Sequence, residues 1–491
     1  MPRDIEVLIT AAEAWPAFER AVLEARDHIT MGFRIFDLST RLRSPEARAI
    51  GTDWFDLLAH ALRRGVRVAL TVSDFDPVMA TGLHELSWRT VRQGVALAEV
   101  TGAGPERLCI RAHMHPAQAG GLPWLAFLPA VLRRKWQALN EVGAARRRFQ
   151  AVGLRRAALP RLHTVSHHQK VAAIDDEVLY VGGLDLNERR YDSPEHDRPA
   201  ARTWSDVQLI LRGPEARAAR MHLETLEEVT AGRTAPPDTP GLKRTLSMPR
   251  RFQLPFVSPH TLVSEIEAAH LDAFATARHL IYVETQYLRS GRIARGLARA
   301  AKRNPELTAV LILPGLPEEL AFDASDSLDV RYGLALQREA VARLRDAFGA
   351  RLTLASPVRP VLAARTTPET LAGSPLIYVH NKVLVRDDDY ALIGSANLNG
   401  RSMRWDTELA VDLSGAEQVA ALRARLIDHW WQGPLPAEAT APETLQPWWQ
   451  AEITRNALRR PENRRGLLVP YDAEAGAAMA QPLPGVTEDI V

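Results

Sequence analysis

The 491-residue sequence contains a single cysteine, Cys109, and only five lysines. One cysteine excludes an internal disulfide framework and a four-cysteine zinc site. Because Cys109 lies between the apolar residues Leu108 and Ile110, we expect it to be a small buried side chain. The chain has 61 basic residues, of which 56 are therefore arginine, so a lysine at a repeated position stands out.

The sequence also lacks long hydrophobic runs. No stretch of about 18 residues is apolar and free of charge, so we expect no membrane-spanning helix. The N-terminal segment contains Asp4 and Glu6 and has no apolar run of about seven residues, so we expect no Sec signal peptide. These absences predict a cytoplasmic or peripheral membrane protein, exported only by a route that reads no N-terminal signal.

A net charge of only +2 argues against a dedicated nucleic-acid-binding protein, although the basic residues are unevenly distributed. An apolar segment with a tryptophan, residues 122–128, precedes a stretch whose only acid is Glu141. The basic residues of that stretch are Arg133, Arg134, Lys135, Arg146, Arg147, Arg148, Arg155, Arg156 and Arg161. We predict that residues 122–161 make peripheral contact with an anionic membrane surface. The alternative is a solvated basic face over a buried apolar segment.

Two segments of the chain share one sparse pattern, H-x-K-x4-D. In each, a glycine follows the histidine by 14 residues and a small polar residue follows it by 17. The corresponding residues are His168, Lys170, Asp175, Gly182 and Asp185 in the first copy, and His380, Lys382, Asp387, Gly394 and Asn397 in the second. Two of the five lysines lie in this repeat, which indicates a need for a compact ammonium group in place of a planar guanidinium.

The order of predicted elements is repeated as well. In the first half, a helix at 15–26, a strand at 28–38, a helix at 54–64 and a strand at 66–72 precede the motif. In the second half, the same order is predicted at 262–278, 280–287, 292–303 and 307–313. This alternation predicts an α/β fold in which helices cover both faces of a sheet.

The length of the chain exceeds what one hydrophobic core usually holds, and 46% hydrophobic with 24% charged residues is typical of a folded globular protein. We predict a first half at residues 1–240, a second half at 241–435 and a Pro- and Ala-rich tail at 436–491. The proline-rich segment 234–241 is the expected linker. The tail has weak periodicity, so we expect it to be extended or partly ordered.

The spacing within the motif has a geometric meaning. On an extended strand residues i and i+2 point to the same side, so the histidine and lysine of each copy project together. The aspartate at i+7 has the opposite parity, so we interpret Asp175 and Asp387 as turn and orientation residues. If the chain then folds back as a hairpin, small residues lie opposite the histidine and lysine and leave room for a ligand, which makes Gly183 and Ser395 expected substrate-binding positions.

Two imidazoles, two ammonium groups and amide or hydroxyl donors suit a phosphodiester substrate. One histidine attacks phosphorus, while the other protonates the leaving alcohol and then deprotonates water. The residue types allow either order. Because the attacking imidazole must be neutral and its partner protonated, we expect their surroundings to separate their pKa values. This chemistry needs no metal, and H-E-x-x-H, C-x-x-C and P-loop motifs are absent, so we expect no metal and no other cofactor.

The residues around both motifs resemble the phospholipase D superfamily, and more narrowly its two-motif, lipid-acting branch. Beyond the motifs, the resemblance rests on the strings SHHQK at 166–170, GGLDL at 182–186, RYD at 190–192, VETQY at 283–287, IGSANLN at 393–399 and DTE at 406–408. It covers residues 15–85 and 160–430. The resemblance implies two α-β-α sandwich halves packed as a pseudo-dimer with one shared active site. Because one chain carries both motifs, we expect a monomer.

The resemblance also implies a role for each residue of the site. His168 would be the nucleophile and His380 the general acid. Phosphate would be bound by Lys170, Lys382 and Asn397, and Asp185 stands at the position that matches Asn397. The histidines would be oriented by Glu408 and Asp206. Asp206 is the less regular match, since it lies 38 residues after His168 whereas Glu408 lies 28 after His380.

The expected function is therefore a phospholipase D that hydrolyses the distal phosphodiester bond of phosphatidylcholine- or phosphatidylethanolamine-like lipids to phosphatidate. Transfer of the phosphatidyl group to other alcohols is expected from the same intermediate. The alternatives are a phosphatidyltransferase of the cardiolipin-synthase kind, a nucleic-acid phosphodiesterase that uses the basic stretch, and a scaffold without catalysis. We expect a phospholipid substrate and no nucleic acid.

Overall fold

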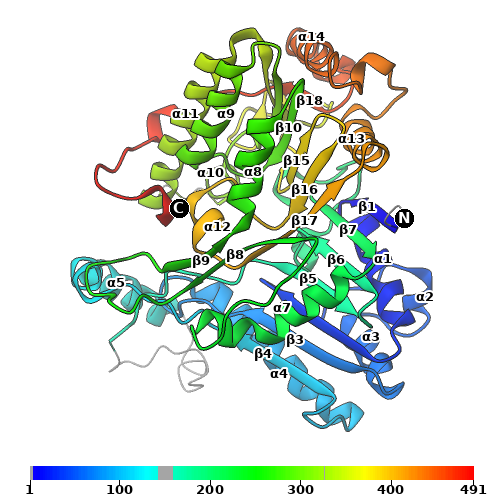
Figure 1. The fold of residues 1–491 in the computed structure, drawn as a ribbon, viewed down its shortest axis with the longest axis vertical. Coiled ribbons are helices and arrows are strands. Elements are labelled where there is room, and N and C mark those ends of the chain that lie inside the picture. Colours follow the sequence, from blue (N-terminus) through cyan, green and yellow to red (C-terminus); the bar gives the residue numbers. More distant parts are fainter. Residues whose placement is uncertain (1–3, 142–158, 324, 326) are drawn as a thin grey trace.

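A computed structural model describes residues 4–141, 159–323, 325 and 327–491. The chain forms two α/β halves, one above the other in Figure 1, each built on a large mixed sheet. Side chains of both sheets meet in one hydrophobic cluster that contains, among others, Val171, Val181, Val383 and Ile393. The two halves therefore share a core.

The first half contains the strands β1 (Asp4–Ile9), β2 (His28–Phe33), β3 (Arg67–Ser73), β4 (Leu108–His113), β5 (Lys170–Ile174), β6 (Val178–Gly182) and β7 (Val207–Arg212). Its helices are α1 (Ala11–Glu24), α2 (Pro45–Arg48), α3 (Trp54–Arg63), α4 (Thr81–Thr101), α5 (Gly121–Glu141) and α7 (Glu215–Thr230). The strand order is β1-β7-β6-β5-β2-β3-β4.

The second half contains the strands β8 (Leu242–Met248), β9 (His260–Ser264), β10 (Leu280–Thr285), β11 (Thr308–Ile312), β12 (Leu352–Pro357), β15 (Lys382–Arg386), β16 (Tyr390–Gly394), β17 (Glu408–Ser414) and β18 (Leu468–Pro470). Its helices are α8 (Glu265–Thr276), α9 (Gly291–Arg303), α10 (Glu318–Ala321), α11 (Leu328–Phe348), α12 (Gly400–Arg404), α13 (Ala416–Trp431) and α14 (Leu445–Leu458). The strands β13 (Thr370–Leu371) and β14 (Ser374–Pro375) form a separate ribbon.

The second sheet repeats the first strand for strand. Its order is β18-β12-β11-β10-β15-β16-β17-β8-β9, so its seven inner strands match β4, β3, β2, β5, β6, β7 and β1 in that sequence. In both sheets the strands that carry the motifs, β5 and β15, lie in the middle. β5 and β15 are buried over almost their whole length, which explains why the residues after each lysine are apolar, except for Arg386 at the less buried end of β15.

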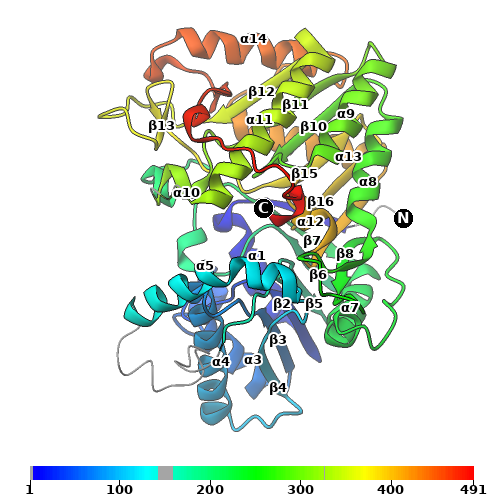
Figure 2. The ribbon, with the colours of Figure 1, turned by 90° about the vertical axis from the view of Figure 1, so that its left-hand side faces the viewer.

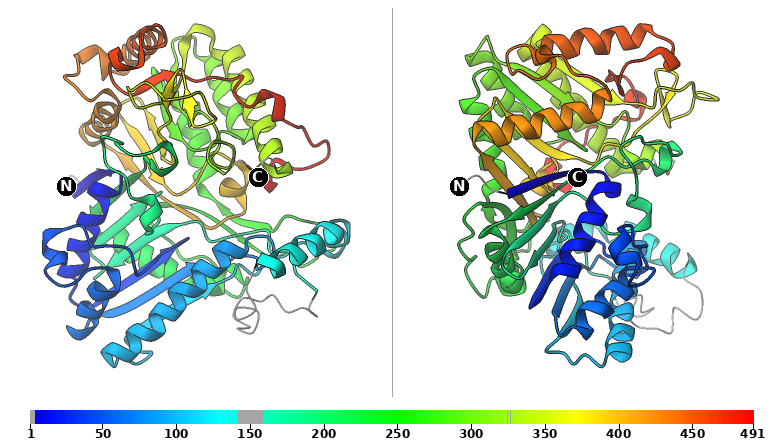
Figure 3. Two further views of the ribbon diagram at one scale, coloured as in Figure 1. Left: turned by 180° about the vertical axis from the view of Figure 1, so that it is seen from behind. Right: turned by 90° about the vertical axis from the view of Figure 1, so that its right-hand side faces the viewer.

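Each sheet has one face toward the shared core and one face toward the outer helices, and successive side chains of a strand point to these two faces in turn. In β5, Val171 and Ala173 point toward the shared core, while Ala172 and Ile174 point toward the outer helices. The helices α7 and α13 contribute side chains to the shared core. Figures 2 and 3 show the two halves from other sides; α1 and α3 pack on the outer face of the first sheet, and α8, α9 and α11 pack on that of the second. The α/β class and the two halves predicted from the sequence are confirmed.

Most predicted elements are present, with shifts of a few residues at their ends. The strand predicted at 28–38 stops at Phe33, because the following chain leaves the sheet and the backbone N–H of Ile35 donates to the Asp185 carboxylate at 3.0 Å. The prediction that Cys109 is buried was wrong. β4 is an edge strand, and the alternation along it buries Leu108 and exposes Cys109.

The C-terminal segment is more ordered than the sequence indicated. Helix α14 places Leu445, Trp449 and Ile453 in the shared core, and β18 pairs antiparallel with β12 at the edge of the second sheet. Within the described ranges, no helix is long and apolar enough to cross a membrane. Of the basic stretch singled out above, Arg146, Arg147, Arg148, Arg155 and Arg156 lie outside the described residues.

Candidate active site

The two motifs lie at the start of the middle strand of each sheet. Lys170 and Lys382 are the first residues of β5 and β15, and each histidine lies two residues earlier. The Lys170 ammonium donates to the backbone oxygen of His168 at 2.6 Å, and the Lys382 ammonium donates to the backbone oxygen of His380. Each lysine is thus held beside the histidine of its own motif.

The backbone of each motif is hydrogen-bonded to the other half. The backbone N–H of His168 donates to Thr407 at 2.8 Å, and that of His380 donates to Ser205 at 2.8 Å. Thr407 precedes Glu408, and Ser205 precedes Asp206. These bonds therefore place an acidic residue of one half beside the histidine of the other.

The two acidic residues pair with the histidines across the boundary. His168 Nδ1 lies 3.0 and 3.2 Å from the carboxylate oxygens of Glu408, and His380 Nδ1 lies 2.6 Å from Asp206 Oδ2. With Nδ1 held by a carboxylate, Nε2 of each ring remains for chemistry. Each half thus supplies the histidine that the other half's carboxylate orients.

The structure gives the small residues Gly183 and Ser395 a different role from the one predicted. A Cβ atom on Gly183 would collide with the Asp206 carboxylate, and the Ser395 hydroxyl donates to the Glu408 carboxylate. The space that we assigned to a ligand is filled by these two carboxylates. Both positions therefore support the orienting acids, and the reason first given for them is corrected.

Asp175 and Asp387 occupy turns and bind backbone amides. The Asp175 carboxylate accepts from the N–H groups of residues 26, 27 and 28, at 2.7 to 2.9 Å. The Asp387 carboxylate accepts from residues 278, 279 and 280, at 2.8 to 2.9 Å. Each carboxylate thus ties the hairpin that follows its motif to the start of the neighbouring strand, away from the histidines.

Burial shapes the protonation of the site. It lowers the pKa of both His168 and His380 well below the usual value, with neighbouring cations such as Lys170 and Lys382 adding to the effect. It lowers the pKa of Lys382 to about 7. Both histidine pKa values therefore shift in the same direction, and the separation between them stays a prediction.

Burial also shifts the pKa of the two orienting carboxylates. Burial raises the pKa of Asp206 to about 7, and it also raises the pKa of Glu408. The short contact between His380 and Asp206 therefore holds a proton near neutral pH, carried by either partner. A proton shared in this way is available to a leaving group at His380.

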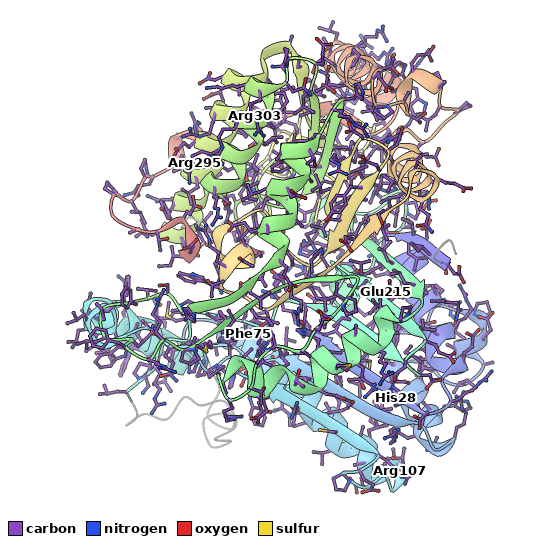
Figure 4. The ribbon with its side chains drawn as sticks, in the orientation of Figure 1. His28, Phe75, Arg107, Glu215, Arg295 and Arg303 are labelled. Carbon is purple, nitrogen blue, oxygen red and sulfur yellow. The ribbon has the colours of Figure 1, made fainter. Side chains whose placement is uncertain are left out.

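A cavity of about 310 Å³ opens beside His168 and is lined from both halves. Both polar and apolar side chains line it, including Arg34, Phe75, Asp76, Met79, Leu83, Val165, Tyr287, Asn397, Arg401 and Asp406. Figure 4 labels Phe75, which lies near the boundary between the halves. The cavity therefore gives a substrate access to His168.

The matching residues Asp185 and Asn397 are used differently. Asp185 accepts from the backbone of Ile35 and lies 3.9 Å from the Lys170 ammonium. Asn397 is buried against the cavity, and its side-chain oxygen has no hydrogen-bond partner within the described residues. The Asp185 carboxylate is thus used for contacts within the protein, whereas the side-chain oxygen of Asn397 remains free to contact a ligand.

Two further residues around His380 were missed in the sequence analysis. The Trp204 ring lies 4.5 Å from the His380 ring, centroid to centroid, and the Arg190 guanidinium lies 3.6 Å from the centre of the Trp204 ring. Both residues belong to short strings next to quoted motifs, RYD at 190–192 and WSD at 204–206. Their position in the sequence between two predicted site residues, Asp185 and Asp206, could have indicated that they lie at the site.

Among the described residues, no group of three His, Cys, Asp or Glu side chains could hold a metal ion.

Comparison with known proteins agrees with this geometry. Residues 271–431 match a family model described as cardiolipin synthase, PLD-like domain. Phospholipase D1 of Schizosaccharomyces pombe is 23% identical over 337 residues, which covers 50% of this chain and 24% of that protein. Phospholipase D2 of Bos taurus is 30% identical over 191 residues, which covers 34% of this chain and 20% of that protein. The matched region thus spans about a quarter or less of these two curated relatives.

The fold is also similar to a solved one. The crystal structure of phosphatidylserine synthase from Haemophilus influenzae Rd KW20 aligns with a TM-score of 0.51 at 12% identity, covering 93% of this chain and 95% of that chain. The paired motifs, their shared site and these matches lead to one assignment. The chain belongs to the phospholipase D superfamily.

Proposed function

We propose that this protein is a phospholipase D. It hydrolyses the distal phosphodiester bond of glycerophospholipids of the phosphatidylcholine and phosphatidylethanolamine class to phosphatidate and a free head group, and it can pass the phosphatidyl group to other alcohols. One observation carries the proposal. His168, oriented by Glu408, lines the cavity together with Asn397, whose side-chain oxygen has no partner among the described residues, and His380 is in short contact with Asp206.

The reaction proceeds in two displacements. Nε2 of neutral His168 attacks phosphorus and forms an N–P bond, while the P–O bond to the head group breaks and the leaving oxygen takes a proton from His380. Neutral His380 then removes a proton from water, the resulting oxygen attacks phosphorus, and the N–P bond breaks to release phosphatidate. The ammonium groups of Lys170 and Lys382 offset the charge that develops on the phosphoryl oxygens.

The lining of the cavity supports an amphiphilic substrate. Phe75, Leu83 and Val165 offer apolar contacts, and Arg34 offers positive charge beside them, while the Arg401 guanidinium is paired with the Asp406 carboxylate at 3.1 Å. A phospholipid presents this pairing of acyl chains with an anionic phosphate. A nucleic-acid phosphodiesterase would need bases to stack or pair and a longer basic groove.

The second candidate is phosphatidyl transfer as the main reaction. The matched family model is named for cardiolipin synthase, and the similar solved structure is a phosphatidylserine synthase. Both reactions share the intermediate on His168 and differ in whether water or an alcohol resolves it. The choice thus depends on the acceptor and not on the residues that attack phosphorus.

Incubation with mixed phospholipids in buffer that contains ethanol tests the proposal. We expect both phosphatidate and phosphatidylethanol, because ethanol competes with water for the phosphorylated enzyme. Phosphatidyl transfer to glycerol-containing lipids with no phosphatidate would favour the transferase. Cleavage of DNA or RNA with no lipid product would contradict both lipid activities.

A further inference from the structure

Helix α5 has two apolar faces, and one of them is exposed. Its inner face packs Val131 and Leu139 against Val78 and Leu162 of the first half. A second set of apolar residues, Leu122, Leu125, Leu132 and Trp136, also has the spacing of one helix face and lies about a quarter turn around the helix from the packed residues. Leu125 is 58% exposed and Trp136 is 61% exposed. A helix that needs only one apolar face for packing therefore presents a second one to its surroundings.

A loop of the second half extends this exposed stripe. Residues 249–259 connect β8 to β9, and they include the exposed residues Phe252, Leu254 and Phe256. The backbone N–H of Leu122 donates to Leu254 at 3.0 Å, and that of Gly120 donates to Phe256 at 2.8 Å. Figures 1 and 2 show α5 projecting from the first half. The stripe on α5 and this loop form one surface, which we call the α5 platform.

The α5 platform carries positive charge, and the only acid of α5 itself is its last residue, Glu141. The segments 114–140, 159–169 and 249–259 contain no aspartate or glutamate, while Arg133, Arg161 and Arg251 are exposed within them. Arg161 follows Pro160, whose carbonyl accepts from the Trp124 indole at 2.8 Å, so it lies beside α5. Exposed apolar and aromatic side chains flanked by arginine match the boundary layer of an anionic bilayer.

The α5 platform also adjoins the cavity. Val78 and Leu162, which pack on α5, are sequence neighbours of the cavity residues Met79 and His163. At the other end of the platform, Val257 packs against a cluster that contains the cavity residue Val165. A bilayer seated on the platform would therefore lie beside the entrance to His168.

We propose that the α5 platform is a docking surface for a bilayer that contains anionic lipid, and that it presents phospholipid to the cavity. The inference rests on the proposed lipid function for its purpose, but the docking itself is independent of catalysis. It replaces the membrane contact predicted for residues 122–161 by a surface to which both halves contribute.

Sedimentation with vesicles tests the docking directly. Binding of the full chain carrying His168→Ala, which removes turnover, is measured on vesicles of equal parts phosphatidylcholine and phosphatidylglycerol. We expect Leu125→Ser, Trp136→Ser and Phe252→Ser together to weaken partitioning roughly tenfold or more. With His168 intact, the same triple variant should keep its activity on a short-chain, monomeric phospholipid to within about twofold, because the site is unchanged.

The matched control replaces equally exposed apolar residues elsewhere. Val95, Leu362 and Leu458 are 66%, 65% and 86% exposed, and changing all three to serine should leave vesicle binding unaltered. Charge reversal at Arg133, Arg161 and Arg251 should weaken binding to these vesicles but not to pure phosphatidylcholine vesicles, and added salt should reproduce the loss.

Three results would overturn the inference: wild-type protein that does not sediment with vesicles, a platform variant that binds like wild type, or a control variant that loses binding equally. If the platform variant instead loses self-association in sedimentation velocity, the surface belongs to a second copy of the chain and the inference fails. Vesicle binding without any phosphatidate or phosphatidylethanol would contradict the proposed function and leave the docking surface standing.

Discussion

Asp206 of the first half lies 2.6 Å from His380 of the second half, so the histidine of one motif is oriented by a carboxylate that belongs to the other sheet. Glu408 and His168 make the reciprocal pair. Because each half lacks the orienting acid for its own histidine, the shared site depends on the interface between the halves.

Asp206→Asn tests this dependence. Asparagine keeps the size of the side chain but removes the negative charge that favours the imidazolium of His380, so we expect kcat to fall by about 10²- to 10⁴-fold with little change in KM. Steady-state kinetics on a soluble substrate measures the effect, with circular dichroism to verify folding. A rise in KM at unchanged kcat would instead place Asp206 in substrate binding.

Gly183→Ala should act through the same carboxylate. A Cβ atom at this position collides with Asp206, so the substitution should lower kcat, and adding it to Asp206→Asn should cost little more. Gly82→Ala on α4 is the control, because a Cβ there meets no atom within 4 Å. Additive losses in the double variant would show that Gly183 acts independently of Asp206.

The aspartates of the motifs should contribute to stability more than to catalysis. Asp175 and Asp387 have φ values of 53° and 47°, a region that asparagine also tolerates, so Asp→Asn isolates the effect of the carboxylate. Since each carboxylate accepts from three backbone amides, we expect either change to reduce the free energy of unfolding by about 1–3 kcal/mol. Denaturant unfolding measures this loss. A large fall in kcat with unchanged stability would contradict the structural role.

We expect kcat/KM to decrease as the pH rises above about 7. The pKa of Lys382 is lowered to about 7 and that of Asp206 is raised to about 7, so both are protonated below this pH and both lose a proton above it. His168, whose pKa burial lowers well below its usual value, is already neutral at this pH. Activity therefore declines as the phosphate-binding cation and the proton for the leaving group are lost.

Lys382→Arg separates the two contributions, because a guanidinium keeps its charge across this range. In the variant, kcat/KM should decrease at alkaline pH with the loss of one proton, whereas in the wild type it decreases with the loss of two. The alkaline limb of the variant should therefore be less steep. The full pH profile of kcat/KM on a soluble substrate decides between them. An alkaline limb of the same steepness in both proteins would show that Lys382 does not titrate in the free enzyme.

The sequence predicted the parts of the fold that local patterns encode. The repeated motif, the hairpins after it and the alternating helices and strands all depend on spacings within about 40 residues. The pairing of Asp206 with His380 and of Glu408 with His168 joins residues 174 and 240 positions apart, and no periodicity within one strand specifies it. The roles of Gly183 and Trp204 depend on that pairing and were missed for the same reason.

Burial was the other quantity that a local pattern did not determine. Cys109 has apolar neighbours, but its strand lies at the edge of the sheet and leaves it exposed. The apolar content of α5 was evident, yet periodicity alone does not show that one of its two apolar faces lacks a partner. Likewise, Asp185 and Asn397 follow the histidines of their motifs by the same number of residues. This equal spacing did not indicate that only Asp185 accepts a hydrogen bond from the backbone of Ile35.

The division of labour between the two histidines is the central claim, and acid-quenched mass spectrometry of two variants tests it most directly. A nitrophenyl phosphodiester is the substrate, because its leaving group needs no proton. We predict that His380→Ala accumulates a phosphorylated His168, since no base activates water, whereas His168→Ala forms no adduct and loses head-group exchange. An adduct on residue 380 in the His168 variant would reverse the assignment, and the absence of an adduct in the wild type and in both variants would contradict the double displacement.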